Sequence, residues 1–227
     1  MQFQISRDAL LKPLQLVSGV VERRQTLPVL ANVLLVLRER ELSLTGTDLE
    51  VELVGKTEVD QAFQSGEVTV PARKLLDICK SLSDGAIVDF ALTDSKLVLK
   101  SGRSRFSLTT LAASEFPNVE EEPDTFSLRI DQSKLRQLLD NTSFAMAQQD
   151  VRYYLNGMLF EVGKDYLRLV ATDGHRLAME TVNLDSALED IQQQILPRKG
   201  VVELSRLLSD EGGDVTLTFG QNHIRAK

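Results

Sequence analysis

The sequence is poor in the residues that build metal centres and disulfides. Among its 227 residues are one cysteine, Cys79, and two histidines, His175 and His223. A single cysteine excludes a disulfide within the chain, and these three side chains are too few for an ordinary Cys/His zinc site. We therefore expect no metal and no cofactor, and we interpret Cys79 and His223 as structural residues.

Aromatic residues and long apolar runs are also scarce. The chain has no tryptophan, and aromatic residues make up 5% of it. No apolar run approaches the roughly 20 residues of a membrane span. The first residues alternate, with Phe3 and Ile5 apolar, and do not form the charged and apolar regions of a signal peptide. We expect a cytoplasmic protein without membrane contact.

Motifs of catalysis are missing as well. There is no Gly-rich phosphate loop, no nucleophile elbow and no metal-ligand cluster. Within Thr172-Asp-Gly-His-Arg176, Asp173 could orient His175 as a base. However, Thr47-Asp48 stands at the equivalent place of an internal repeat without a histidine nearby, which favours a turn that caps backbone N–H groups. We expect no catalytic residues and no enzymatic activity.

The chain does contain an internal repeat, and the repeat organises it. Amphipathic stretches open at residues 5–10 and 130–135, and a predicted strand pair follows each of them. Thr47-Asp48 and Thr172-Asp173 then follow the two strand pairs at an offset of 125 residues. A second predicted helix starts at Val70-Pro-Ala-Arg-Lys74 in one half and at Leu196-Pro-Arg-Lys199 in the other, and short strands follow both.

Residues 115–124 separate the two halves. This stretch is rich in acidic residues and proline and has no periodicity, as is typical of a linker. The pattern predicts two similar α+β domains, at residues 1–120 and 126–227, each with two helices packed on antiparallel sheet. The expected helices cover roughly residues 5–20, 71–82, 131–147 and 198–209.

The net charge of −7 argues at first against nucleic acid, but the charge is unevenly distributed. The four expected helices hold ten basic and five acidic residues, a net of +5, which leaves −12 for the rest of the chain. The pairs Arg73-Lys74 and Arg198-Lys199 recur just inside a helix start, where the helix dipole disfavours cations. Helix surfaces are often rich in lysine, so a solvated face is the alternative to a DNA-facing one.

Signatures of base reading do not accompany these charges. The sequence has no helix-turn-helix, zinc finger or aromatic RNA-binding motif. If the chain binds DNA, contact with the phosphate backbone independent of sequence is the better fit.

Several runs of the sequence, in their order along the chain, carry a resemblance to a known family. The most specific are Gln149-Asp-Val-Arg-Tyr-Tyr-Leu-Asn-Gly-Met-Leu-Phe160 and Ala171-Thr-Asp-Gly-His-Arg-Leu177. Further runs are Thr26-Leu-Pro-Val-Leu30, Leu44-Thr-Gly-Thr-Asp-Leu-Glu50, Val70-Pro-Ala-Arg-Lys74, Ser101-Gly-Arg-Ser-Arg-Phe-Ser107 and Pro197-Arg-Lys-Gly200. In these runs the chain resembles the bacterial sliding clamp, the beta subunit of DNA polymerase III.

The resemblance implies a homodimeric ring whose subunits each have three similar domains, with sheets outside and helices lining a hole for duplex DNA. The two repeats would be two of the three domains, and we expect the end of the second domain and the whole third domain to be missing. Such a protein is a non-catalytic processivity factor in DNA replication. A clamp-derived module that binds partner peptides without encircling DNA is the alternative.

The resemblance also implies two sets of site residues. The residues implied to contact DNA are Arg24 in the loop after the first helix, Gln149, Tyr153 and Tyr154 in the loop after the third, and, in addition, Arg73, Arg105, Arg198 and Lys199. Two adjacent tyrosines at the head of a strand cannot both point inward, so we expect at least one of them to be exposed.

The second set is one wall of a pocket for short peptides, implied at Arg152, Leu155, Thr172, Gly174, His175, Arg176 and Leu177. In this pocket Leu155 and Leu177 would offer apolar surface to the partner's side chains. The implied partners are double-stranded DNA, the DNA polymerase III catalytic subunit, the clamp loader, and other polymerases and repair proteins that carry a short peptide motif.

Overall fold

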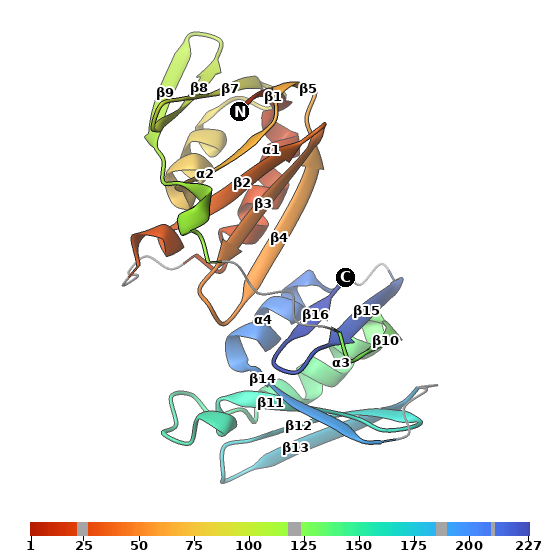
Figure 1. The fold of residues 1–227 in the computed structure, drawn as a ribbon. Coiled ribbons are helices and arrows are strands. Elements are labelled where there is room, and N and C mark those ends of the chain that lie inside the picture. Colours follow the sequence, from red (N-terminus) through yellow and green to blue (C-terminus); the bar gives the residue numbers. More distant parts are fainter. Residues whose placement is uncertain (22–26, 118–123, 185–189, 210–211) are drawn as a thin grey trace. The chain divides into compact units, whose positions relative to one another are not determined.

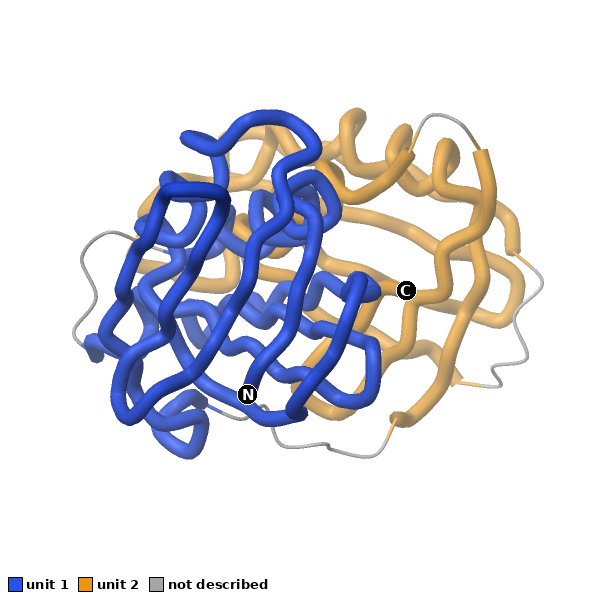
Figure 2. The backbone as a smooth tube through the Cα atoms, turned by 90° about the horizontal axis from the view of Figure 1, so that it is seen from above, with its two compact units in different colours: residues 1–119 blue, residues 120–227 orange. Residues whose placement is uncertain are grey.

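The computed structural model describes residues 1–21, 27–117, 124–184, 190–209 and 212–227. The chain divides into two compact units, Met1–Val119 and Glu120–Lys227, which Figure 2 draws in two colours. Among the described residues, each unit has two α-helices and two antiparallel sheets (Figure 1), as expected of an α+β protein.

The first unit has a five-stranded sheet in the order β5-β1-β7-β8-β9 and a four-stranded sheet in the order β4-β3-β2-β6. Its helices are α1 (Arg7–Val17) and α2 (Ala72–Ser81). Its strands are β1 (Gln2–Ser6), β2 (Asn32–Arg38), β3 (Glu41–Thr47), β4 (Glu52–Glu58), β5 (Gln61–Gln64), β6 (Gly66–Pro71), β7 (Ile87–Thr93), β8 (Lys96–Ser101) and β9 (Ser104–Thr109).

The second unit has a three-stranded sheet in the order β10-β15-β16 and a four-stranded sheet in the order β13-β12-β11-β14. Its helices are α3 (Gln132–Ser143) and α4 (Arg198–Leu207). Its strands are β10 (Phe126–Asp131), β11 (Gly157–Val162), β12 (Tyr166–Thr172), β13 (Leu177–Asn183), β14 (Gln192–Pro197), β15 (Asp214–Phe219) and β16 (Ile224–Ala226).

The start of each first helix differs from the prediction. Residues expected to open the helices belong instead to β1 and β10, which end at Ser6 and Asp131. These two residues cap the helices, because Ser6 Oγ accepts from Ala9 N and Asp131 Oδ1 accepts from Lys134 N. The helices are also shorter than expected at their other ends, since α1 ends at Val17 and α3 at Ser143.

Each unit has its own hydrophobic core, built from strands of both sheets and one face of each helix. In the first unit Phe3 stacks on Phe90 across the β1/β7 pair, with ring centroids 4.6 Å apart. In the second, Phe126 stacks on Phe219 across β10/β15 at 4.5 Å. Such pairs add about 0.5–1.5 kcal/mol beyond the area that they bury.

Cys79 lies in the first of these cores, as expected of a structural cysteine. Its side chain is fully buried in α2, and burial raises the pKa of the thiol to about 11. Within the described part of the chain, no helix is long and apolar enough to cross a membrane. The same residues contain no group of His, Cys, Asp and Glu side chains arranged to hold a metal ion.

Candidate nucleic-acid interface and partner-binding turn

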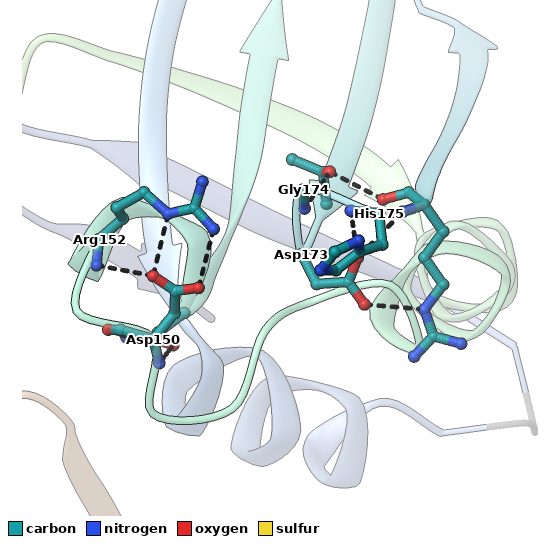
Figure 3. Close-up of polar contacts among 8 residues, drawn as sticks. Asp150, Arg152, Asp173, Gly174 and His175 are labelled. Atoms are coloured by element: carbon teal, nitrogen blue, oxygen red, sulfur yellow. Dashed lines mark hydrogen bonds and ion pairs between the residues drawn. The ribbon is translucent and has the colours of Figure 1, made fainter.

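The turn between β12 and β13 is a polar turn closed by its own side chains (Figure 3). Thr172 Oγ1 accepts from Gly174 N at 3.1 Å and donates to Arg176 O at 2.7 Å. Asp173 Oδ1 accepts from the backbone N–H groups of His175 and Arg176, both at 3.0 Å. Asp173 therefore caps backbone groups, and these hydrogen bonds, together with a salt bridge to Arg176, lower its pKa.

The first unit contains the same turn between β3 and β4. Thr47 Oγ1 accepts from Leu49 N and donates to Val51 O, and Asp48 Oδ1 accepts from Glu50 N and Val51 N. Every one of these bonds has its counterpart 125 residues later. The prediction that Thr-Asp forms a capping turn in both halves is confirmed, and the catalytic interpretation of Asp173 and His175 loses its support.

The loop from Ala147 to Asn156 lies next to the turn of the second unit. Asn156 closes the loop, because its side-chain amide accepts from Asp150 N at 2.9 Å and donates to Asp150 O at 2.8 Å. The Asp150 carboxylate accepts from the backbone N, Nε and Nη2 of Arg152 at 2.8–3.0 Å (Figure 3). These bonds lower the pKa of Asp150 to about 2, chiefly through the Arg152 side chain, so the carboxylate stays charged.

The same loop exposes the side chains that were predicted to contact DNA. Gln149 is exposed, with a left-handed backbone at φ 58°. Tyr153 and Tyr154 lie in a single 3-10 turn, Tyr153–Leu155, and not at the head of a strand. Both are exposed, at 84% and 50%, so the expectation that at least one of them is exposed is confirmed, and the alternative of two core residues at the head of a strand is wrong.

Each unit has an arginine at the start of its second helix that bonds a nearby carbonyl oxygen. Arg198 is the first residue of α4, and its Nη1 donates to Met146 O at 3.4 Å. Arg73, the second residue of α2, donates through Nη2 to Val21 O, also at 3.4 Å. Lys199 follows Arg198 and is half-buried. Each helix-start arginine is thus bonded to the segment that follows the first helix of its own unit.

Arg105 lies exposed on β9, the last strand of the five-stranded sheet, where a strand was predicted. Arg24 lies outside the described residues. In the second unit, the structure places Gln149, Tyr153 and Tyr154 on one loop and bonds Arg198, the neighbour of Lys199, to both ends of that loop.

The helix charge needs one correction. As observed, the four helices carry ten basic and four acidic residues, because Asp131 precedes α3 as its cap. Two of the basic side chains bond the neighbouring helix of their own unit: Arg7 donates to Cys79 O, and Arg136 donates to the carbonyl oxygens of Ser205 and Leu208. Both hold the C-terminal end of the neighbouring helix, where cations are favoured.

The residues predicted for a peptide pocket gather on the turn and the loop. Thr172, Gly174, His175 and Arg176 lie on the turn, and Leu177 opens β13 with 64% of its side chain exposed. Leu155 is only 8% exposed, so most of it is buried within the second unit, and its place in the pocket wall stays a prediction. Leu177 offers exposed apolar surface to a partner at this place.

The loop and the turn border one shallow depression of about 400 Å³. Its lining consists of Met146, Ala147, Gln148, Gln149 and Asp150 on one side and Asp173, His175 and Arg176 on the other. Arg176 connects the two sides, because its Nη2 donates to Phe144 O at 2.8 Å while its Nε pairs with Asp173. Arg152 also lies over the turn, since a methyl group placed on Gly174 would be 3.2 Å from Arg152 Nη2.

Sequence reasoning missed Asp150 and Asn156 as the residues that shape the loop. Both fall inside the run Gln149–Phe160 that carried the resemblance. The available signal was their residue type, since Asp and Asn side chains commonly bond nearby backbone groups in loops. Their spacing of six residues is outside the usual local patterns and concealed the pairing.

Comparison with known proteins gives one consistent result. Residues 1–120 match the family model of the DNA polymerase III beta subunit, N-terminal domain, and residues 129–227 match that of its central domain. The chain is 61% identical over 226 residues to the beta sliding clamp of Pseudomonas putida and 47% identical to that of Escherichia coli K12. It covers 62% of the length of each of these relatives.

Solved structures agree. The DNA polymerase III subunit beta from Pseudomonas aeruginosa superposes on the whole chain with a TM-score of 0.96 at 60% identity, and the chain covers 62% of it. Caulobacter crescentus pol III beta superposes on the chain with a TM-score of 0.93 at 38% identity, and the chain covers 63% of it. The chain belongs to the family of the DNA polymerase III beta subunit, the bacterial beta sliding clamps, and matches its N-terminal and central domains.

Proposed function

We propose that this chain is part of a sliding clamp, a processivity factor that encircles duplex DNA and keeps a replicative polymerase on its template. The observation that carries the proposal is the match of the whole chain to beta sliding clamps at up to 62% identity. The repeated turn and the repeated helix-start arginines support it, because they show two copies of one domain built with the same polar contacts.

The ring requires more than these two domains. We propose that residues 1–120 and 126–227 are two of three similar domains, and that two complete subunits close into a homodimeric ring. A partner held on such a ring experiences a raised local concentration of DNA, so that its rebinding becomes effectively intramolecular. The protein acts without catalysis, in the cytoplasm.

The DNA-binding surface is assigned to the exposed loop together with the helix starts that adjoin such loops. Gln149, Tyr153 and Tyr154 lie on one loop, and Arg198 and Lys199 lie beside it. We keep Arg24 and Arg73 as the corresponding residues of the first unit, and Arg105 as a further basic residue on β9. Weak contacts to the phosphate backbone suit a ring, because retention comes from topology and tight binding would prevent sliding.

Partner proteins are assigned to the turn. Arg152, Leu155, Thr172, Gly174, His175, Arg176 and Leu177 form one wall of the proposed peptide pocket. The partners proposed are the DNA polymerase III catalytic subunit, the clamp loader, and other polymerases and repair proteins with a short peptide motif. Exposed Leu177 beside the charged side chain of Arg176 suits a peptide with an apolar anchor.

The second candidate is a module that binds partner peptides without encircling DNA. The observation that favours it is the depression of about 400 Å³ between the loop and the turn, whose lining residues all belong to the second unit. It predicts peptide binding that does not depend on DNA and no retention on circular DNA.

Charge reversal tests the DNA assignment. The double variant Arg24→Glu, Gln149→Glu should lower the amount of protein loaded on DNA by about tenfold, because phosphate contacts are electrostatic, while peptide binding and thermal stability stay unchanged. The matched control, Arg38→Glu with Gln64→Glu, makes the same changes of charge on exposed positions of β2 and β5. Loss of peptide binding with normal DNA loading would show that the two sites were assigned wrongly.

A further inference from the structure

Arg198 holds both ends of the loop that carries Gln149, Tyr153 and Tyr154. Its backbone N–H donates to Asn156 O at 2.9 Å, and its guanidinium Nη1 donates to Met146 O at 3.4 Å. One residue of α4 is therefore bonded to the residue before the loop and to the residue that ends it.

The bonds inside the loop continue this closure. Ala147 N donates to Leu155 O at 3.0 Å. This bond joins the two ends of the loop, one residue inside Met146 and Asn156, which Arg198 bonds. The Asn156 side chain then bonds both backbone groups of Asp150. Hydrogen bonds thus connect the two sides of the loop from its ends to Asp150, and Arg198 makes the bonds at the ends.

The first unit repeats the guanidinium bond. Arg73 and Arg198 are 125 residues apart, and so are the carbonyl acceptors at Val21 and Met146. The two distances are equal at 3.4 Å. The recurrence in a separately folded unit shows that this bond is a feature of the domain and not an accident of one side chain.

The position of these arginines is otherwise unfavourable. The first turn of a helix carries a partial positive charge, so a cation there costs a few tenths of a kcal/mol. A guanidinium can offset this cost by donating to a carbonyl oxygen outside the helix, which is what both arginines do. The bond explains why an arginine recurs in the first turn of the second helix of both units, which a charged helix surface alone does not explain.

We propose that Arg198 is a positioning residue, which fixes the loop that presents Gln149, Tyr153 and Tyr154 and acts on DNA through that loop. The inference rests on the proposed DNA contact of the loop. Tyr153 is 84% exposed and Val151, two residues before it, is 98% exposed, so the tip of the loop has little packing to fix it. Fixing it in advance lowers the conformational cost of contact with DNA.

Direct phosphate contact and positioning predict different salt dependence. Each phosphate contact contributes about 0.9 to the slope of log affinity against log salt concentration, because binding releases counterions. Neutralising a residue that contacts phosphate makes this slope less steep. Replacing a positioning residue by one of the same charge lowers the affinity for DNA and leaves the slope unchanged.

The experiment compares Arg198→Lys, Arg198→Gln and the neighbouring control Lys199→Gln in the complete protein. Binding of a short labelled DNA duplex is followed by fluorescence anisotropy over a series of salt concentrations. Hydrogen exchange is measured at the amides of Ala147, Asp150, Leu155 and Asn156, all of which are bonded within the loop.

We expect Arg198→Lys to weaken DNA binding by about threefold at an unchanged salt slope, because the lysine keeps the charge and lacks the guanidinium fork. Exchange at the four loop amides should rise by about tenfold as the loop opens more often. Arg198→Gln should raise exchange in the same way. Lys199→Gln should make the salt slope less steep by about 0.9 and leave hydrogen exchange at the loop amides unchanged.

Two results would overturn the inference. If Arg198→Lys binds DNA as the unmodified protein does and Arg198→Gln lowers the slope as Lys199→Gln does, Arg198 contacts phosphate directly. If loop exchange is the same in all variants, Arg198 does not fix the loop. Failure of the proposed function looks different, because then the unmodified protein itself shows no salt-dependent DNA binding while the exchange differences persist.

Discussion

Leu49 and Gly174 occupy the same position in two copies of one turn, and both have a left-handed backbone, with φ of 79° and 87°. Glycine adopts this conformation without strain, whereas a leucine pays about 1–2 kcal/mol for it. The Leu49 side chain is 62% exposed, so packing returns little of that cost. The turn of the first unit is therefore strained where that of the second is relaxed.

Leu49→Gly should stabilise the first unit by roughly 0.5 kcal/mol, because relief of strain exceeds the added flexibility of the unfolded chain. Gly174→Ala should destabilise the second unit, since it adds strain at φ 87° and places a methyl group 3.2 Å from Arg152 Nη2. Denaturant unfolding of both variants measures the two changes. A destabilised Leu49→Gly would mean that the leucine has a packing role outside its own turn.

Arg136→Met should lower the stability of the second unit by about 2 kcal/mol, the usual range for hydrogen bonds from a charged group. The substitution leaves the carbonyl oxygens of Ser205 and Leu208 at the end of α4 without their donor. DNA affinity should stay the same once the protein is folded, because this guanidinium faces its own unit. A drop in affinity at full folding would return Arg136 to the DNA surface.

Acid should remove the contribution of Asp150 in a defined window. Its pKa is about 2 in the folded chain against an ordinary value of 3.8, so its stabilising effect is complete above about pH 4 and is lost as the pH falls towards 2. Asp150→Asn should therefore be less stable than the unmodified protein at neutral pH and equally stable near pH 2. Urea unfolding across this range tests the convergence. A constant difference at all pH values would assign the effect to packing and not to the charge.

Cys79 should be inert in the folded protein. The thiolate is the reactive form, and burial raises the pKa of this thiol to about 11. Iodoacetamide at about pH 8 should leave the native chain unmodified and should label it fully in guanidinium chloride, as mass spectrometry can show. Rapid labelling of the native protein would mean that α2 opens to solvent.

The repeat made most of the fold predictable. Hydrophobic periodicity located all four helices, and the Thr-Asp pairs located the equivalent turns at Thr47 and Thr172. The strands that precede the first helices were missed because Ser6 and Asp131 end a strand and cap a helix at once. A strand of five or six residues that is followed directly by a helix has too few alternating positions to distinguish the two-residue period of a strand from the 3.6-residue period of a helix.

The sequence indicated which residues belong to the candidate site, but not what each side chain contacts or whether it is buried. The resemblance selected Arg198 and Leu155 by position, but a sequence does not show that Arg198 donates to Met146 O or that Leu155 is buried. Charge counting likewise treated Arg7 and Arg136 as surface cations. Their acceptors lie 72 and 69 residues away in sequence, so only the fold shows that these charges are used internally.

Topological retention tests the central claim most directly. The complete protein is loaded by its clamp loader onto nicked circular DNA, the circle is then cut once, and release is followed over time. An encircling clamp predicts that the protein stays on the circle and leaves the linear DNA over its free ends. Equal retention on circular and linear DNA would contradict encirclement and indicate ordinary charge-driven binding, and absence from both would favour the peptide-binding module.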